Sequence, residues 1–208
     1  MVKVKVCGIT NLEDAQAASR FGADVLGFIF TVKSPRYIKP PEAKKIIENL
    51  DPFILKCGVF LDQDRDEVLE IAATLNLDIL QFHGQESPAY CKSFAPRFKV
   101  VKVLFPKDAP FAATINKYKV DAYLFDIKPE EKAGAKKLLP AEAKKEIAAL
   151  IKAGTRVIIS SGLNVDNVGA TAKLNPYAID AASGIEEFVG KKDHVKMAEF
   201  IKIAKGAK

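Results

Sequence analysis

Sulfur and tryptophan are scarce in this sequence, which has three cysteines, two methionines and no tryptophan in 208 residues. The cysteines, Cys7, Cys57 and Cys91, are odd in number and lack the paired spacing of metal ligands, so we expect neither disulfides nor a zinc site. No apolar run approaches the ~18–20 residues of a membrane span, and residues 1–5 resemble a strand rather than a signal peptide. We therefore expect a cytoplasmic protein that holds no metal and contacts no membrane.

Concentrated positive charge is absent too, although the formal net charge is +6. Lysines stand beside glutamates along helical stretches, as in Glu42-Ala43-Lys44-Lys45. A nucleic-acid binder instead gathers its basic residues in a patch interleaved with aromatic residues. Solvated helix faces explain the pattern better than a nucleic-acid partner does. The mild positive field still favours a small anionic molecule as ligand.

No stretch rich in glycine, proline or serine divides the chain, so we predict one domain over residues 1–208. Short apolar runs alternate with helical patterns throughout, and such runs are typical of strands covered on both faces. The expected strands are 3–6, 24–30, 53–60, 78–82, 98–104, 122–125, 156–159 and 177–180. The expected helices are 12–21, 41–50, 65–75, 88–94, 109–118, 140–152, 165–174 and 194–204.

This alternation requires parallel crossovers, and eight such units predict an α/β fold with a single (β/α)8 TIM barrel. A doubly wound open sheet is the alternative. The first βα turn argues against it, because Cys7-Gly8-Ile9-Thr10 lacks the G-x-G-x-x-G pattern, and no Walker lysine motif occurs. An aspartate opens the second, fourth and sixth strands, at Asp24, Asp78 and Asp121. This position at the bottom of a barrel predicts a stabilising role.

The carboxyl ends of barrel strands meet at one mouth, where chemistry is expected. Cys7 follows the first expected strand, and Asp126 follows the sixth, three steps away around an eight-stranded ring. Their side chains should therefore converge with room for a substrate between them. A thiolate can accept a carbon-bound proton and a carboxyl group can donate one, so the two form a candidate acid–base pair. The alternatives are a buried apolar role for Cys7 and a cap or ion pair for Asp126.

Small residues follow the seventh and eighth strands, at Ser161-Gly162 and Ser183-Gly184. In barrels of this kind the two loops, with a helix N-terminus, form the usual phosphate site. Small residues suit it because backbone N–H groups can then approach the ligand. Asn164 is placed to begin the helix behind Gly162. The pattern predicts a phosphate cradle, and two tight turns are the plainer alternative.

Three further polar residues stand at the same mouth. Arg36 follows Ser34-Pro35, which stiffens its turn, and a guanidinium there can hold a carboxylate through two hydrogen bonds. A surface arginine is the alternative. His83 follows the fourth strand and Asp180 ends the eighth. We expect His83 to be hydrogen-bonded rather than catalytic, and we assign His83 and Asp180 with Arg36 to substrate binding.

Taken in order, these motifs resemble the phosphoribosylanthranilate isomerase family, tryptophan-pathway enzymes with a (β/α)8 fold. The match runs nearly from end to end, and short motifs carried in order by barrel segments make a specific signal. The matching segments are Lys5-Val6-Cys7-Gly8-Ile9-Thr10, Gly22-Ala23-Asp24, Ser34-Pro35-Arg36-Tyr37, Cys57-Gly58-Val59-Phe60, Gln81-Phe82-His83-Gly84, Ser161-Gly162-Leu163-Asn164, Asp180-Ala181-Ala182-Ser183-Gly184-Ile185-Glu186 and Gly190-Lys191-Lys192-Asp193.

The resemblance implies an Amadori rearrangement without metal or cofactor. N-(5-phosphoribosyl)anthranilate would become 1-(2-carboxyphenylamino)-1-deoxyribulose 5-phosphate. The resemblance also implies roles: Asp126 protonates the furanose ring oxygen, and Cys7 removes the C2 proton from the resulting Schiff base. Arg36 would hold the anthranilate carboxylate, and the turns at Gly162 and Ser183-Gly184 would bind the phosphate.

Two stretches depart from the family pattern. Residues 127–139 keep one glycine where relatives often have a glycine-rich loop, which predicts altered closure over the substrate. Ser160-Ser161-Gly162 stands where relatives usually have A-G-G, which predicts a modest change in phosphate affinity. Two other functions stay open: another phosphosugar isomerase or epimerase, and a phospholigand-binding barrel without turnover. The sequence is compatible with a monomer or a homodimer.

Overall fold

Eight parallel strands close into a barrel in chain order in a computed structural model, which describes residues 1–127 and 139–206. Each strand bonds to the next and β8 bonds to β1, so the predicted (β/α)8 barrel is confirmed and the open-sheet alternative is wrong. The strands are β1 (Lys3–Cys7), β2 (Val25–Ile29), β3 (Leu55–Phe60), β4 (Ile79–Phe82), β5 (Lys99–Leu104), β6 (Ala122–Phe125), β7 (Val157–Ile159) and β8 (Ala178–Ala181).

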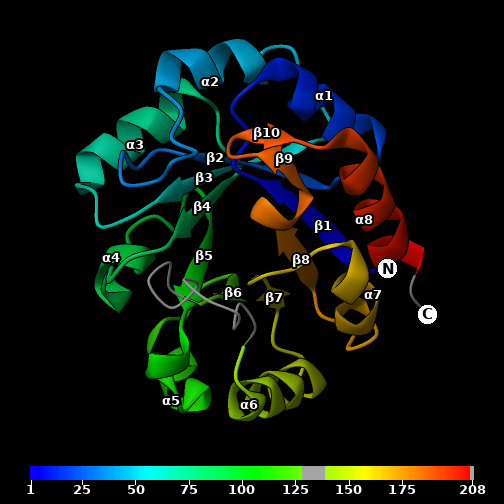
Figure 1. Ribbon diagram of the computed structural model, residues 1–208. Coiled ribbons are helices and arrows are strands. Elements are labelled where there is room, and N and C mark those ends of the chain that lie inside the picture. The colour runs from blue at the N-terminus through cyan, green and yellow to red at the C-terminus, as the bar shows by residue number, and fades with distance from the viewer. Residues whose placement is uncertain (128–138, 207–208) are drawn as a thin grey trace.

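Within the described residues, eight helices follow one another around the outside of this ring of strands (Figure 1). None of the helices in the described ranges is long and apolar enough to cross a membrane. The helices are α1 (Leu12–Arg20), α2 (Pro40–Ile47), α3 (Arg65–Thr74), α4 (Pro88–Lys92), α5 (Phe111–Lys117), α6 (Ala141–Lys152), α7 (Val165–Ala172) and α8 (His194–Gly206). Short 3₁₀ turns occupy η1 (Pro106–Asp108) and η3 (Ser183–Ile185). The altered loop expected at 127–139 lies, apart from its two end residues, outside the described residues.

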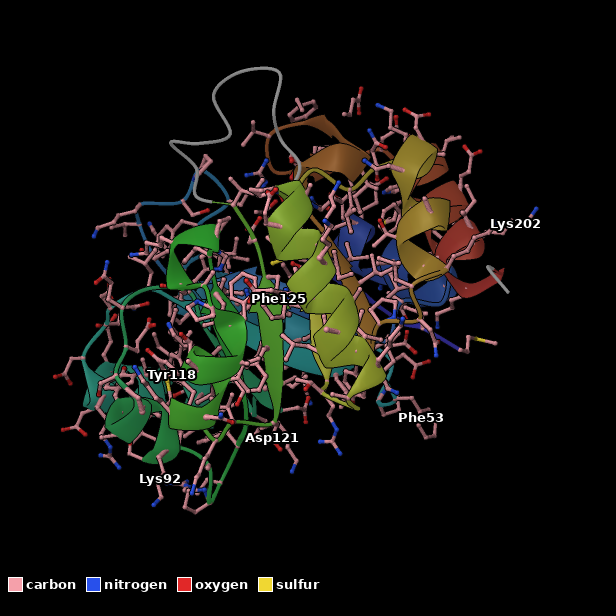
Figure 2. All side chains as sticks on the ribbon, turned by 90° about the horizontal axis from the view of Figure 1, so that it is seen from below. Phe53, Lys92, Tyr118, Asp121, Phe125 and Lys202 are labelled. Carbon is pink, nitrogen blue, oxygen red and sulfur yellow. The ribbon has the colours of Figure 1, made fainter. Side chains whose placement is uncertain are left out.

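Most elements differ from the predicted ranges by one to three residues at an end, and two differences have clear local reasons. The third strand begins at Leu55 rather than at residue 53, because Phe53 stands in the preceding turn and is 92% exposed (Figure 2). A short antiparallel hairpin of β9 (Glu186–Phe188) and β10 (Lys191–Lys192) follows β8 and was not predicted. Its strands are too short and too charged to show a strand pattern.

The barrel separates two regions of apolar packing, as the alternation of strand residues requires. Leu26 and Phe28 of β2 belong to the large core between the strands and the helices. Val25, on the opposite face of β2, packs with Cys7 and Cys57 inside the barrel. A second inner cluster fills the rest of the interior with Val101, Val103, Phe105, Ala122, Leu124, Ile158 and Ala178. The interior is therefore a packed core, and ligands can enter only at its mouth.

Three aspartates join neighbouring strands at the amino ends of β2, β4 and β6, where a stabilising role was predicted. Figure 2 shows one of them, Asp121, at the end of β6 opposite Phe125. Each carboxylate accepts a hydrogen bond from a backbone N–H of the preceding strand, and each residue also pairs with a lysine. The bonds are Val4 to Asp24 at 2.7 Å, Lys56 to Asp78 at 2.8 Å and Val100 to Asp121 at 2.9 Å, and the paired lysines are Lys205, Lys56 and Lys99.

Candidate active site

One cavity at the carboxyl ends of the strands gathers all nine residues that the sequence nominated. They arrive from β1, β4, β6, β7 and β8 and from the loop after β2, so strand order alone places them together. Among the described residues, no cluster of three or more His, Cys, Asp and Glu side chains is arranged to hold a metal ion. The nine are Cys7, Arg36, His83, Asp126, Ser161, Gly162, Asp180, Ser183 and Gly184.

Cys7 ends β1, and its thiol is buried against the cavity wall. Its neighbour across the ladder is Gly27 of β2, which has no side chain to obstruct the sulfur. A Cβ on Gly27 would stand only 2.8 Å from Cys7 Sγ, so glycine makes the room that the thiol occupies. Burial raises the pKa of Cys7, and the positive charge of Lys5 opposes this rise. Burial therefore favours the protonated thiol, and Lys5 favours the thiolate.

Asp126 directly follows β6, where its backbone N–H still bonds to the carbonyl of Leu104 at 3.1 Å. Its Oδ1 accepts a hydrogen bond from Ile127 N at 2.7 Å, and its Oδ2 lies 3.7 Å from His83 Nε2. The His83 ring is in turn 3.3 Å from the side-chain nitrogen of Gln81. The carboxyl group is thus fixed at the wall of the cavity while one oxygen faces a histidine.

Gln81 is a lining residue to which the sequence argument gave no role. It is 2% exposed, and its Oε1 has no hydrogen-bond partner among the described residues. A buried oxygen without a partner costs ~1–3 kcal/mol, so such an atom in a cavity wall is suited to receive a ligand donor. The sequence Gln81-Phe82-His83-Gly84 could have predicted this position, because residues two apart on a strand share one face and Gln81 therefore lies on the same face as His83.

The turn after β7 has a backbone conformation that lets a ligand approach its N–H groups closely. Ser161 and Gly162 have φ values of 78° and 64°, in the left-handed region that glycine adopts readily and serine rarely does. Asn164 caps α7 as predicted, accepting hydrogen bonds from the N–H groups of residues 166 and 167. The side chain of Asn167 donates to the Gly162 carbonyl at 2.9 Å. The turn is therefore anchored to the first turn of α7.

The turn after β8 packs against the turn after β7, with backbone atoms of both turns in contact. Gly184 lies in the 3₁₀ turn, and a Cβ there would collide with the carbonyl oxygen of Leu163. Only glycine fits at this position without moving one of the two loops. Ser183 and Gly184 therefore stand next to the turn of Ser161 and Gly162, which is the arrangement expected of the predicted phosphate cradle.

Arg36 already holds a carboxylate, that of Glu186 in β9. Its Nε donates to Glu186 Oε1 at 2.7 Å and its Nη2 to Oε2 at 2.6 Å, a two-pronged ion pair. Burial disfavours the charged carboxylate, but Arg36 and Lys192 outweigh it and lower the pKa of Glu186. Nη1 makes no hydrogen bond to any described residue. The sequence argument missed Glu186 because it missed the hairpin, although the matched segment contained it.

Lys192 of β10 fixes the same hairpin to the barrel. Its side chain is fully buried, and Nζ donates to Glu186 Oε1 at 3.0 Å, to the Cys7 carbonyl at 2.8 Å and to the Ala182 carbonyl at 3.2 Å. The hairpin thus connects the residue that grips Arg36 with the backbone that carries Cys7.

Residues 4–203 match the family model described as N-(5'-phosphoribosyl)anthranilate (PRA) isomerase. The chain belongs to the phosphoribosylanthranilate isomerase family. An N-(5'-phosphoribosyl)anthranilate isomerase from Geobacter sp. (strain M21) is 44% identical over 207 residues, which are 99% of this chain and 98% of that relative. The resemblance seen in the motifs is confirmed, and the chain is an isomerase of this type.

Solved structures of the family superimpose on the whole chain. The crystal structure of phosphoribosyl anthranilate isomerase from Thermotoga maritima has a TM-score of 0.89 at 37% identity, covering 99% of this chain and all of its own. A second structure of the family enzyme, in complex with reduced 1-(o-carboxyphenylamino)-1-deoxyribulose 5-phosphate, has a TM-score of 0.83 at 34% identity, with 99% and 100% covered. The roles of individual residues in this chain stay predictions.

Proposed function

We propose that this isomerase rearranges N-(5-phosphoribosyl)anthranilate in the described cavity, with Cys7 as general base and Asp126 as general acid. The observation that carries the proposal is their placement. The two residues line one cavity from strands three steps apart around the barrel, and polar recognition groups line the same walls. An acid and a base held on opposite sides of a substrate are what an internal proton transfer requires.

The reaction is a sequence of proton transfers in which these two side chains serve as acid and base. Asp126 donates a proton to the furanose ring oxygen, the bond from that oxygen to C1 breaks, and a protonated Schiff base remains. The thiolate of Cys7 then takes the proton from C2, which gives an enolamine that tautomerises to the ketone. Each proton transfer of this kind contributes ~10²–10⁴ in rate.

Recognition of the substrate divides between the two sides of the mouth. Backbone groups of the turns at Ser161-Gly162 and Ser183-Gly184 support phosphate binding there, with the N-terminus of α7 behind them. On the other side, the Nη1–Nη2 edge of Arg36 stays available to the anthranilate carboxylate, because Glu186 occupies the Nε–Nη2 edge. His83, Asp180 and the unpartnered oxygen of Gln81 line the space between these sides.

Turnover is tested by mixing the protein with freshly made substrate and following the loss of anthranilate fluorescence. Cys7→Ser and Asp126→Asn should each lower kcat by ~10²–10⁴. Undiminished turnover by either variant would refute its role, and no turnover by the wild type would refute the reaction. A non-catalytic phospholigand barrel instead predicts binding of a reduced product analogue without any fluorescence change.

The assembly state and compartment complete the proposal. A family member from Thermotoga maritima is described as a dimeric isomerase from which monomers were generated. We propose that this chain is a monomer or a homodimer and works in the cytoplasm on a small phosphorylated anion. Light scattering on the purified protein distinguishes the two assembly states.

A further inference from the structure

Three buried lysines differ in how completely their ammonium groups are bonded. A lysine ammonium has three N–H donors and no acceptor. Lys102 places them on Glu86 and on the carbonyls of Phe82 and Gly84, and Lys192 likewise has three oxygen partners. Lys5, with 4% of its surface exposed, bonds to one oxygen among the described residues, Asp180 Oδ1 at 2.9 Å, and its other hydrogen-bond neighbour is the Cys7 sulfur. The ammonium of Lys5 therefore has fewer oxygen partners than those of Lys102 and Lys192.

The ammonium of Lys5 lies beside the sulfur of Cys7. Lys5 and Cys7 are two residues apart on β1, so their side chains share the inner face of the barrel. A Cβ built on Gly27 would stand 2.8 Å from Cys7 Sγ and 3.1 Å from Lys5 Cε, so both groups surround the same small space. Asp180 is opposite Lys5 in the ladder of β1 and β8 and holds the lysine from the other side.

We propose that Lys5 is the positioning residue that makes Cys7 a base, by donating to the Cys7 sulfur an N–H that Asp180 leaves unused once the thiol has released its proton to solvent. The thiolate then accepts the C2 proton of the substrate and is restored to the thiol. Asp180 opposes this effect, because its negative charge competes for the same ammonium. The inference rests on the proposed role of Cys7 as general base.

The charges around the sulfur support this balance. An opposite charge within ~4–6 Å favours the ionised form of a group, and a like charge disfavours it. Lys5 is the largest influence that lowers the pKa of Cys7 against burial, and Asp180 raises it. The titratable groups that interact with Cys7 are Lys5 of β1, Cys57 of β3, Asp180 of β8, Lys192 of β10 and Arg36 of the loop after β2; His83 and Asp126 line the same cavity, and Glu186 of β9 contacts Lys192.

The test measures the thiol itself, apart from turnover. In a Cys57→Ala/Cys91→Ala background, iodoacetamide modifies Cys7 alone, and the pH dependence of its rate gives the midpoint of thiolate formation. Lys5→Met should raise this midpoint by about 1–3 units, so the rate well below it falls ~10-fold per unit. Asp180→Asn should move the midpoint in the opposite direction. Lys102→Met removes another buried lysine, away from Cys7, and should leave the midpoint unchanged.

Opposite shifts separate this inference from a purely structural ion pair. If Lys5 and Asp180 only stabilise the barrel, both variants lose stability in urea and neither moves the midpoint, which overturns the proposal. The double variant Lys5→Met/Asp180→Asn has neither charge of the pair. Its midpoint should lie above that of Asp180→Asn, because Asp180→Asn keeps the Lys5 ammonium that stabilises the thiolate. Turnover by Cys7→Ser decides the proposed function separately. An inactive Cys7→Ser with an unmoved midpoint in Lys5→Met overturns only the role of Lys5.

Discussion

Glu186 offers the sharpest test of how substrate recognition is organised. Its side chain is 4% exposed and lies between Arg36 and Lys192. Glu186→Gln keeps the shape of the side chain but replaces a carboxylate that accepts three charged hydrogen bonds with a neutral amide. The amide retains one acceptor oxygen, and its NH₂ group faces donors. Arg36 therefore loses one prong of its anchor.

The expected size of the effect follows from that lost bond. A hydrogen bond to a charged group contributes ~1.5–3 kcal/mol. If that energy holds Arg36 ready for the anthranilate carboxylate, its loss weakens substrate binding by about 10- to 150-fold. In the proposed function Arg36 holds a part of the substrate that does not react, so ground state and transition state would lose the contact equally. KM should rise while kcat changes little.

The assay compares the natural substrate with the phosphoribosyl derivative of aniline, which lacks the carboxylate. Glu186→Gln should raise KM for the first and leave KM for the second within about twofold of the wild type. Glu187→Gln is the matched control, because the next residue of β9 is exposed and carries the same charge. Its KM values should equal those of the wild type.

Two results would refute this reasoning. An equal rise in KM for both substrates would mean that Glu186 supports the cavity in general rather than the carboxylate site. A fall in kcat with KM unchanged would place Glu186 in the proton transfers. Urea unfolding of both variants keeps a general loss of stability apart from a loss of recognition.

Three further predictions address the remaining parts of the site and fold. Gly184→Ala should weaken the binding of a reduced product analogue by at least ~10-fold in calorimetry, because its Cβ meets the Leu163 carbonyl; unchanged affinity would refute the cradle. Asp121→Ala leaves a buried N–H of β5 unpaired and should lower the free energy of unfolding by ~1–3 kcal/mol without changing KM. Burial raises the pKa of Cys7, and only the thiolate accepts a proton, so kcat/KM should rise with pH through a midpoint above the ordinary thiol value of 9.0. If kcat/KM is already constant at neutral pH and above, the predicted upward shift of the Cys7 pKa is wrong.

The strands were predictable because their physical signal is local. Runs such as Val157–Ile159 are apolar and short, and a barrel that buries both faces of each strand leaves few other readings for them. The hairpin of β9 and β10 gives no such signal. Its residues Glu186 and Lys192 are charged, and their burial depends on the ion pair between them and on the further pair of Glu186 with Arg36. A buried ion pair depends on a contact between distant or irregular segments. Hydrophobic periodicity and secondary-structure propensity are local properties of the sequence and cannot predict such a contact.

The site was predictable for a different reason, which also marks its limit. Chain order around a closed barrel brings every strand end to one mouth, so position alone nominated Cys7 and Asp126. The same argument does not show which side chain opposes which. Arg36 was expected to hold a carboxylate of the substrate, and the structure shows a protein carboxylate, that of Glu186, on its Nε–Nη2 edge. The expected contact with the substrate can still form at the Nη1–Nη2 edge, and only the three-dimensional packing shows which edge Glu186 occupies.

Two buried ion pairs, Lys5–Asp180 and Lys192–Glu186, lie beside residues proposed for catalysis or substrate recognition. Glu186 and Lys192 hold Arg36 and the backbone of Cys7 through bonds that leave no ammonium donor over. Lys5 is arranged differently, since its pair with Asp180 leaves donors beside the sulfur. A fully bonded pair serves position, whereas a partly bonded one can respond when a neighbouring group ionises. In the role proposed for Lys5, its incomplete bonding to oxygen connects the buried charges of the barrel to the chemistry of Cys7.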